Sequence, residues 1–325
     1  MKSYLLCLLP IVFFLACEDK EDAPLPSDCA GVENGTAEMD NCGNCIGGNT
    51  GEIACTQDCA DDWGGTAIED CNSECGGTAF ENECGYCVEG NTGLDEDYCI
   101  VTDIDGNEYE IVKFGVQLWT AENLKVTHYN NGDEISTYNN DDWSSLASGA
   151  YGVHNNDPSN EAIWGNLYNW YAVDDDRGIC PESWHVPTDD EFKQLEMFLG
   201  MSEEDANSPS NTGTRGTDEG SKLAGNAELW IGDSWGSETV LENNSVFGTS
   251  GFDGLPGGSR DGSFNGGYGS VGFYCYFWTS TKIDSTLEFP WNDYAWDRDL
   301  YDFTSEVLRR WFDKKNGFSV RCVKD

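Results

Sequence analysis

Residues that commonly perform chemistry are few and scattered in this chain of 325 residues. The three histidines, His128, His154 and His185, stand singly, so no His-x-x-His pair of metal ligands is present. His185 lies just before a predicted helix cap, where we expect a structural imidazole. Paired carboxylates carry no signal in a chain with 60 acidic residues. We therefore expect a protein without a catalytic site, and not an enzyme.

Cys17 is a candidate for covalent lipid attachment. The apolar run from Tyr4 to Leu15 is too short to span a membrane comfortably and has the layout of a secretory signal. Phe14-Leu15-Ala16-Cys17 resembles a bacterial lipoprotein processing site, with ordinary signal-peptidase cleavage as the alternative. We expect a signal peptide over 1–16 and an acidic tether over 17–27. The mature chain would then lie in the cell envelope, anchored by lipid to the outer membrane and exposed at the surface.

Ten of the fifteen cysteines fall in the segment 28–100, which we call the Cys-rich segment. It contains internal repeats, among them the Cys-x-x-Cys pairs Cys42–Cys45 and Cys84–Cys87. Zinc ribbons also use two such pairs, but with a shorter gap between them. In an exported chain, an even set of cysteines is typical of a disulfide framework, and this is the interpretation we favour. We expect a disulfide-stapled stalk with little regular structure.

The charge of the chain restricts its partners. The formal net charge is −43, which repels nucleic acid and anionic membranes, so we expect no nucleic-acid partner and membrane contact only through the lipid anchor. Residues 28–99 contain no lysine or arginine. Their carboxylates could hold Ca²⁺ between stapled loops, but a solvated acidic surface is the favoured interpretation. No other cofactor is indicated.

The composition changes near residue 100, where cysteines stop and strand-like alternation begins. Asp103–Asn107 resembles a Ca²⁺ loop, but the required Gly and Glu are missing, so a hairpin over 101–115 is the better prediction. Thr188 and Glu191 form a capping box that predicts a helix over 189–199. The remaining expectations are a short helix near 164–171, a mobile loop over 200–220, and strands at 272–281, 293–301 and 317–324. Together they predict a small α+β domain over 101–325 with long loops.

Six phrases occur in a fixed order along this domain. They are Glu122-Asn123-Leu124-Lys125, Trp164-Gly165-Asn166-Leu167-Tyr168-Asn169-Trp170, Trp184-His185-Val186-Pro187-Thr188, Leu255-Pro256-Gly257-Gly258, Trp278-Thr279-Ser280-Thr281 and Ser319-Val320-Arg321-Cys322. With these phrases the segment 101–325 resembles the Fibrobacter succinogenes major paralogous domain, a family of bacterial envelope lipoproteins. The resemblance implies a loop-rich fold that is distantly C-type-lectin-like, the group that also includes formylglycine-generating enzymes.

The resemblance also bears on the three cysteines of this domain. Cys180 and Cys322 lie in or beside family phrases, and lectin-like folds carry a long-range bridge, so the resemblance implies that these two cysteines pair. Formylglycine-generating enzymes use an active-site cysteine pair, for which only Cys275 would remain. We expect Cys275 to pack in a strand as a small apolar residue.

Two features suggest ligand binding. Sugar rings stack on flat indole faces, and four tryptophans lie in Gly- and Asp-rich loops, although core packing is an alternative for each of them. These are Trp230, Trp235, Trp291 and Trp296. Trp291-Asn292-Asp293 also copies a tripeptide with which sugar-binding C-type lectins hold Ca²⁺. It makes Asn292 and Asp293 candidates for a metal site, with a simple loop as the alternative.

These patterns predict an anchored surface lipoprotein whose head performs recognition or adhesion without chemistry. The expected partners are polysaccharide or another envelope component. A structural envelope protein that packs against partner proteins is the second hypothesis. An enzyme related to the formylglycine generators is the third.

Overall fold

The computed structural model describes residues 25–208, 213–232, 240–263, 265–283 and 293–325, which fall into two compact units. The first unit ends at Ala79 and the second, which we call the head, comprises Phe80–Asp325. The last module of the Cys-rich segment therefore belongs to the head. Its Cys84 lies in the main core cluster of the head, and the ammonium of Lys324 lies 5.6 Å from the ring centroid of Tyr86.

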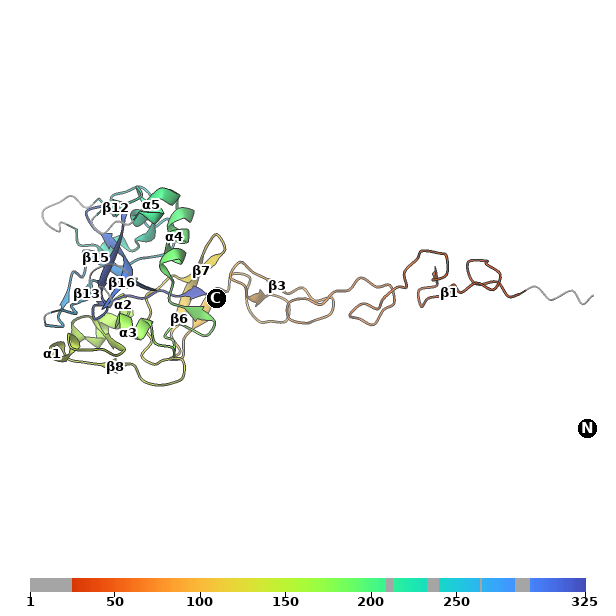
Figure 1. The fold of residues 1–325 in the computed structure, drawn as a ribbon, viewed down its shortest axis with the longest axis horizontal. Coiled ribbons are helices and arrows are strands. Elements are labelled where there is room, and N and C mark those ends of the chain that lie inside the picture. The colour runs from red at the N-terminus through yellow and green to blue at the C-terminus, as the bar shows by residue number, and fades with distance from the viewer. Residues whose placement is uncertain (1–24, 209–212, 233–239, 264, 284–292) are drawn as a thin grey trace, which may run out of the picture. The chain divides into compact units, whose positions relative to one another are not determined.

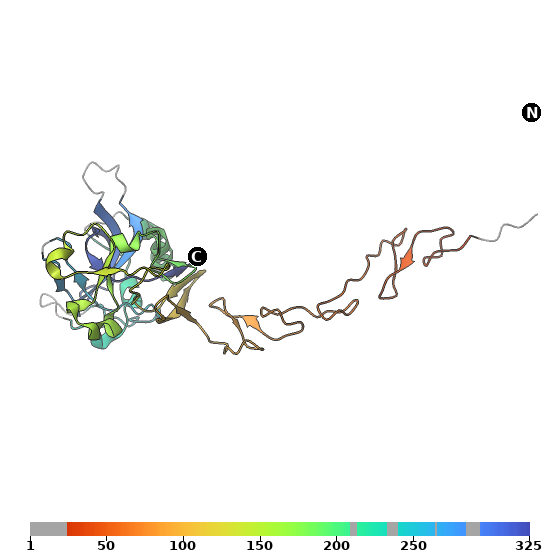
Figure 2. The same cartoon turned by 90° about the horizontal axis from the view of Figure 1, so that it is seen from below.

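The Cys-rich segment consists of successive loops with little regular structure (Figures 1 and 2). Disulfides close these loops. Regular structure is limited to two-residue ladders, β1 (Glu38–Met39) with β2 (Cys45–Ile46) and β3 (Phe80–Glu81) with β4 (Cys87–Val88). The prediction of a disulfide framework is confirmed. The bridges include Cys29–Cys45, Cys42–Cys55, Cys59–Cys75 and Cys84–Cys99, and Cys71 and Cys87 are also disulfide-bonded.

One side chain organises each loop of the Cys-rich segment. In the loop that begins at Asp58, one carboxylate oxygen accepts the amides of Ala60 and Asp62, and the other accepts the amide of Ala67. These hydrogen bonds, led by that from Ala67, hold the pKa of Asp58 below its ordinary value. The same arrangement recurs at Asp28, Asp40 and Asp70, and with an amide in place of the carboxylate at Asn82.

The head is an α+β unit with more strand than helix, arranged as three main sheets. A four-stranded sheet has the order β12 (Thr214–Arg215), β17 (Val307–Asp313), β16 (Tyr294–Tyr301), β15 (Tyr274–Lys282). A five-stranded sheet has the order β11 (Trp184–His185), β19 (Val323–Lys324), β7 (Gln117–Thr120), β6 (Glu108–Phe114), β5 (Ile100–Thr102). A six-stranded sheet has the order β14 (Tyr268–Gly269), β13 (Ser259–Arg260), β18 (Gly317–Phe318), β10 (Leu167–Asn169), β9 (Ala150–Gly152), β8 (Ser136–Thr137).

The helices of the head are short and lie around these sheets (Figure 1). The longest is α4 (Asp189–Phe198), which begins with the predicted capping box between Thr188 and Glu191. Among the described residues, every helix falls short of the length and apolar character that a bilayer crossing requires. The others are α1 (Asn140–Trp143), α2 (Glu161–Trp164), α3 (Trp170–Val173), α5 (Glu203–Asn207) and α6 (Glu219–Leu223), with 3-10 turns η1 (His154–Asn156), η2 (Pro158–Asn160) and η3 (Ala227–Leu229).

Several predicted elements are confirmed, namely the hairpin β5–β6, helix α4 and the long strands β15 and β16. The helix predicted near 164–171 is wrong. Gly165 has a φ of 70°, which ends α2, and the chain then enters β10 before Asn169 caps α3. The loop predicted over 200–220 is also wrong in part, because it contains α5 and β12.

Buried charges join α4 to the four-stranded sheet. Glu196 is fully buried and accepts hydrogen bonds from Arg215, at 2.7 and 3.0 Å, and from Arg298, at 2.6 Å. Asp189 accepts two hydrogen bonds of 2.7 Å from Arg309 and lies 2.9 Å from Arg298. Burial alone would raise the pKa of Asp189, but these guanidinium groups outweigh it and lower that pKa. The network fixes the position of α4 on the sheet.

The opposite face of the same sheet carries a buried acidic pair. Asp297 and Asp299 are fully buried on β16, and Arg310 donates to Asp299 at 2.6 Å. Burial and the neighbouring Asp299 raise the pKa of Asp297 well above its ordinary value.

Arg260, on β13 of the six-stranded sheet, is fully buried. Its guanidinium lies between the rings of Trp143, at 3.9 Å, and Tyr268, at 4.8 Å, and donates to the carbonyls of Tyr138 and Gly266. Gly152 on β9 has no side chain, and the guanidinium of Arg260 occupies the space beside it.

Replacing Gly152 by alanine is expected to lower the free energy of unfolding by about 1–3 kcal/mol. An added Cβ would lie 2.5 Å from Nη1 of Arg260 and 2.6 Å from the hydroxyl of Tyr268, and both groups are held in place. Urea denaturation measures the change. Gly269→Ala is the matched control, since a Cβ at that position meets nothing within 4 Å. Equal stability of the two variants would show that the Gly152 contact is not constraining.

Candidate functional site

A cleft of about 440 Å³ opens on the head between segments that are far apart in the sequence. Its polar lining comes from Glu122, Asn123, Lys125, Asn226 and Asp253, and its apolar lining includes Ile163, Leu229 and Leu255. The segments 122–125, 164–170 and 255–258, each of which carries a family phrase, contribute residues to this lining. We therefore take the cleft as the candidate functional site.

Buried hydrogen bonds fix the floor of the cleft. Arg321 is fully buried and donates to Oδ1 of Asn123 at 2.8 Å, and also to the carbonyls of Phe252, at 2.7 Å, and Asp253, at 2.8 Å. Asn123 in turn donates to the carbonyl of Trp164 at 2.8 Å. The guanidinium of Arg321 therefore links the segments around Asn123 and Asp253 directly, and the segment around Trp164 through Asn123. Arg321 belongs to the last family phrase of the sequence.

The backbone approaches closely at Gly165. A Cβ at this position would lie 2.7 Å from the Cβ of Asn123 and 2.9 Å from the carbonyl oxygen of Leu124, and φ is 70°. Glycine is therefore required for the segment after α2 to reach the floor of the cleft.

The cleft presents groups suited to polar recognition. Asp253 is exposed and has a φ of 49°, and Asn226, also exposed, has a φ of 48°, so both side chains leave left-handed positions of the backbone. Lys125 and Glu122 form an ion pair at 2.6 Å. Leu229 and Leu255 add a partly exposed apolar surface. The arrangement offers hydrogen-bond donors and acceptors beside an apolar ridge, which is how sites for small polar ligands are built.

The structure does not place the predicted tryptophans in this cleft. Trp230 is buried, with 4% of its surface exposed, and its Nε1 donates to the carbonyl of Gly225 at 3.0 Å. Trp230 therefore packs in the core, which is the alternative that the sequence left open for each of the four tryptophans. Trp296 is partly buried, and the guanidinium of Arg309 lies 3.7 Å from its ring centroid.

The other predicted binding residues are only partly described. Trp235, Trp291 and Asn292 lie outside the described residues, as does Cys17. Asp293 is exposed, and its carbonyl accepts the amide of Lys314 at 2.7 Å.

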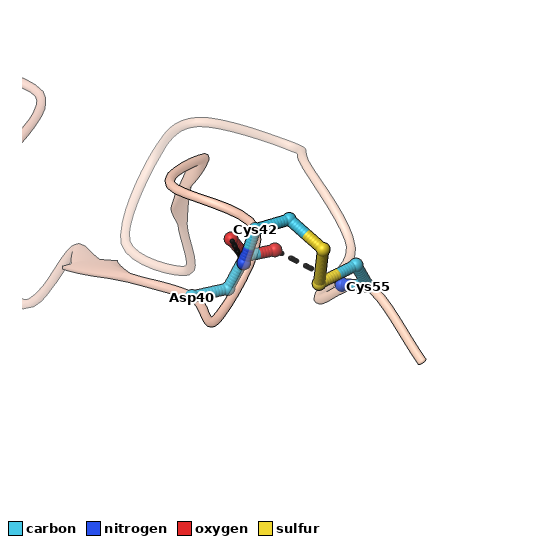
Figure 3. A group of neighbouring side chains, drawn as sticks. All are labelled: Asp40, Cys42 and Cys55. Carbon is cyan, nitrogen blue, oxygen red and sulfur yellow. Dashed lines mark hydrogen bonds between the residues drawn. A yellow bond between two sulfur atoms is a disulfide. The ribbon is translucent and has the colours of Figure 1, made fainter. Parts of the chain in front are cut away.

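One cluster in the Cys-rich segment has the spacing of a metal site, namely Asp40, Cys42 and Cys55 (Figure 3). The two sulfurs are bonded to each other, so they are not thiolate ligands. The carboxylate of Asp40 accepts the amides of Cys42 and Cys55, at 2.9 and 3.0 Å. The geometry therefore serves the loop and does not suit a metal.

The three cysteines after residue 100 separate into a bridge and a buried thiol. Cys180 and Cys322 form a disulfide, the pair that the resemblance implied. Cys275 is a free cysteine with none of its surface exposed, and burial raises the pKa of its thiol. It packs in a core cluster as a small apolar residue, as predicted. A protonated thiol in that position is a poor nucleophile.

Two short stretches of the sequence have the spacing of known chemical motifs, Glu-x-x-His and Gly-x-Ser-x-Gly. Glu182 stands three residues before His185, but His185 bonds to Glu191 and Asp325 instead. Gly232–Gly236 has the Gly-x-Ser-x-Gly spacing of a nucleophile elbow, and all but its first residue lie outside the described residues.

His185 is a structural group, as predicted, and its partners are two carboxylates. Its Nδ1 lies 2.7 Å from Asp325 and its Nε2 lies 2.9 Å from Glu191. The hydrogen bonds that His185 donates to Glu191 and to Asp325 raise its pKa to about 9.

The stability that His185 contributes is expected to fall as the pH rises. Because the folded pKa, about 9, lies above the ordinary value of 6.5, the contribution is complete below pH 6.5 and is lost as the pH passes 9. Urea midpoints measured from pH 6 to pH 10 would show this decline, and His185→Gln should flatten the curve in this range. A wild-type curve as flat as that of the variant would contradict the assignment.

Comparison with known proteins identifies the family. The model of the Fibrobacter succinogenes major domain matches residues 112–324, more than half of the chain. The chain belongs to this family. The same comparisons found no match among curated proteins and none among solved structures.

Proposed function

We propose that this chain is a lipid-anchored protein of the cell surface whose head recognises polysaccharide or another envelope component without performing chemistry. The single observation that carries the proposal is the cleft described above, where three of the family phrases meet over a floor held by Arg321. A head of C-type-lectin-like architecture, as the resemblance implies, would suit this role.

The chemistry of the cleft favours a neutral, hydroxyl-rich ligand. The carboxylates of Asp253 and Glu122 can accept hydrogen bonds from hydroxyl groups, and the amide of Asn226 can both donate and accept. Leu229 and Leu255 can pack against the C–H face of a sugar ring. Because the floor is preorganised, binding would order few additional groups.

Titration against a panel of polysaccharides tests the proposal. The mature chain, produced in an oxidising compartment, should bind at least one member saturably. Asp253→Asn should weaken that binding about tenfold or more, because it removes one charged acceptor. Asparagine tolerates the left-handed backbone at this position, so the melting temperature should not change.

The matched control is Asp190→Asn, which removes one exposed carboxylate from α4, where 82% of the side chain is accessible. It should leave polysaccharide binding unchanged. A panel without any ligand, or equal effects of the two variants, would reject the cleft as a glycan site. A protein partner in the envelope would then become the stronger hypothesis.

Anchoring is tested separately. Cys17→Ser should abolish metabolic labelling of the chain with a radioactive fatty acid and release it from the membrane fraction. Labelling that persists in the variant would show that Cys17 is not the acceptor.

A further inference from the structure

The five-stranded sheet of the head carries two lysines on one face. Lys113 on β6 lies opposite Leu118 on β7, and Val323 on β19 lies opposite Trp119 on β7. In this antiparallel register Lys324 is therefore the neighbour of Leu118 on its other side. Side chains that are directly opposite project from the same face of a sheet. A lysine, a leucine and a second lysine thus lie side by side across three strands.

These three side chains and Val116 form a surface that we call the lysine patch. They line a cavity of about 510 Å³ that shares no lining residue with the cleft. Val116 lies at the turn between β6 and β7 and is 93% exposed. Phe198, which is 57% exposed, borders the same turn, because a Cβ at Gly115 would lie 3.3 Å from its ring. The patch therefore combines cations with accessible apolar surface.

The charges of the lysine patch are not neutralised. Within the part of the chain that the structure describes, neither Lys113 nor Lys324 forms an ion pair within 4.0 Å. Asp325 also lines the cavity, but its carboxylate lies 2.7 Å from His185. In a chain with 60 acidic and 17 basic residues, two neighbouring cations without such a partner attract an acidic surface.

The opposite wall of the cavity shows which surface the patch accepts. That wall comes from the last module of the Cys-rich segment and includes Glu81 and Glu83. A Cβ at Gly85 would lie 3.0 Å from the ammonium of Lys324, so this acidic loop passes directly over one end of the patch. Lys113 and Val116 remain exposed beside it. One loop of the Cys-rich segment thus contacts the patch within the head, and part of the patch is left accessible.

The loop that begins at Asp58 is built like the loop at Asn82 and carries an additional aromatic ring. In both loops one side-chain oxygen accepts two backbone amides from the residues that follow. Trp63 ends the first of these loops and, at 48%, is the one exposed tryptophan among the described residues. The neighbouring Asp61 and Asp62 are exposed as well. An indole flanked by two carboxylates complements an apolar surface flanked by two lysines.

We propose that the lysine patch binds the loop Asp58–Trp63 of a second copy of this chain. The indole would pack on the apolar side chains of the patch, and the carboxylates beside it would pair with Lys113 and Lys324. Tryptophan is a common anchor of protein interfaces. The contact joins two different surfaces, so each copy keeps one free half and further copies can add in the same way.

Sedimentation equilibrium of the mature chain tests the proposal. Each copy carries a net charge of −43, so the buffer contains about 150 mM salt, which screens repulsion beyond roughly 8 Å. The average mass should rise with concentration. Trp63→Ala should weaken this association about tenfold or more. Ile53→Ala, at a position that is 90% exposed in the same unit, is the matched control and should not. A monomeric mass at every concentration would overturn the proposal.

A variant of the head locates the other half of the contact. Lys113→Glu should weaken association about tenfold or more, because it replaces an attraction by a repulsion. Lys282→Glu makes the same change in net charge at another exposed lysine and should have little effect. Equal losses in the two variants would show a general effect of charge and reject the patch. Should Lys113→Glu fail to fold, Lys113→Gln removes the charge alone and takes its place.

Mixing the two variants gives a readout specific to a contact between different surfaces. Trp63→Ala keeps an intact lysine patch, and Lys113→Glu keeps an intact loop. Each variant alone should therefore be largely monomeric, whereas the mixture should form dimers and nothing larger. Both substituted residues are exposed, so the melting temperatures should not change. A mixture as monomeric as its components would show that the loop and the patch do not bind each other.

Discussion

Glu196→Gln is expected to lower the free energy of unfolding by about 3–5 kcal/mol. Glu196 is fully buried and joins Arg215 on β12 to Arg298 on β16. Glutamine has nearly the same shape, but it lacks the charge that compensates the two guanidinium groups. Both would remain buried beside a neutral amide, and breaking a buried ion pair by removing one partner costs more than the pair itself contributes.

The measurement is urea denaturation followed by the tryptophan fluorescence of the head. Glu182→Gln is the matched control. Glu182 is exposed, so the same chemical change there should alter stability by less than about 0.5 kcal/mol. We also expect Arg215→Met in the Glu196→Leu background to be more stable than Glu196→Leu alone, because Glu196 is the carboxylate that pairs with Arg215 and paired apolar groups can replace a buried ion pair. A Glu196→Gln variant as stable as the control would show that the charge of Glu196 does not stabilise the folded head.

Removal of the Cys180–Cys322 bridge is expected to cost about 3–5 kcal/mol. The bridge closes a loop of 142 residues, and the entropy lost by the unfolded chain grows with loop length. Both cysteines are buried, at 1% and 0% exposure, so alanine at both positions keeps the site apolar. The loss should appear as a lower urea midpoint of the double variant.

The matched control is Cys275→Ala, which removes a buried sulfur without breaking a bridge. Its cost is expected to be about 1 kcal/mol, from lost packing alone. If the double variant loses no more stability than two such packing changes would explain, the bridge does not constrain the unfolded chain.

Local signals in the sequence were sufficient for some elements of the head. The capping box of Thr188 and Glu191 predicted α4 because both halves of that motif lie within four residues. The hairpin β5–β6 was predicted from its turn. In contrast, β17 was not predicted, because Arg309 and Arg310 interrupt its apolar alternation. Their side chains pair with Asp189 and Asp299, partners that lie elsewhere in the chain.

Long-range contacts also explain what was missed at the cleft. Asn123 and Arg321 are 198 residues apart, and each alone has the composition of a surface residue. Arg215 lies in a Ser-, Gly- and Asp-rich stretch that predicted a loop, yet it is buried against Glu196. The tryptophans were candidates because indole rings stack on sugars. Trp230 is nevertheless buried, although its sequence neighbourhood is rich in glycine. Sequence patterns report local geometry, and buried polar pairing is not local.

The overlapping bridges of the Cys-rich segment have a mechanical consequence. Fully extended, the chain from Cys29 to Cys55 would span about 90 Å. Force applied there instead follows the bridge Cys29–Cys45, with Cα atoms 5.6 Å apart, three residues back to Cys42, and the bridge Cys42–Cys55, at 6.3 Å. That covalent path reaches only about 23 Å. Pulling on this module can therefore lengthen it very little even if every hydrogen bond breaks, so it would transmit tension as a nearly inextensible link.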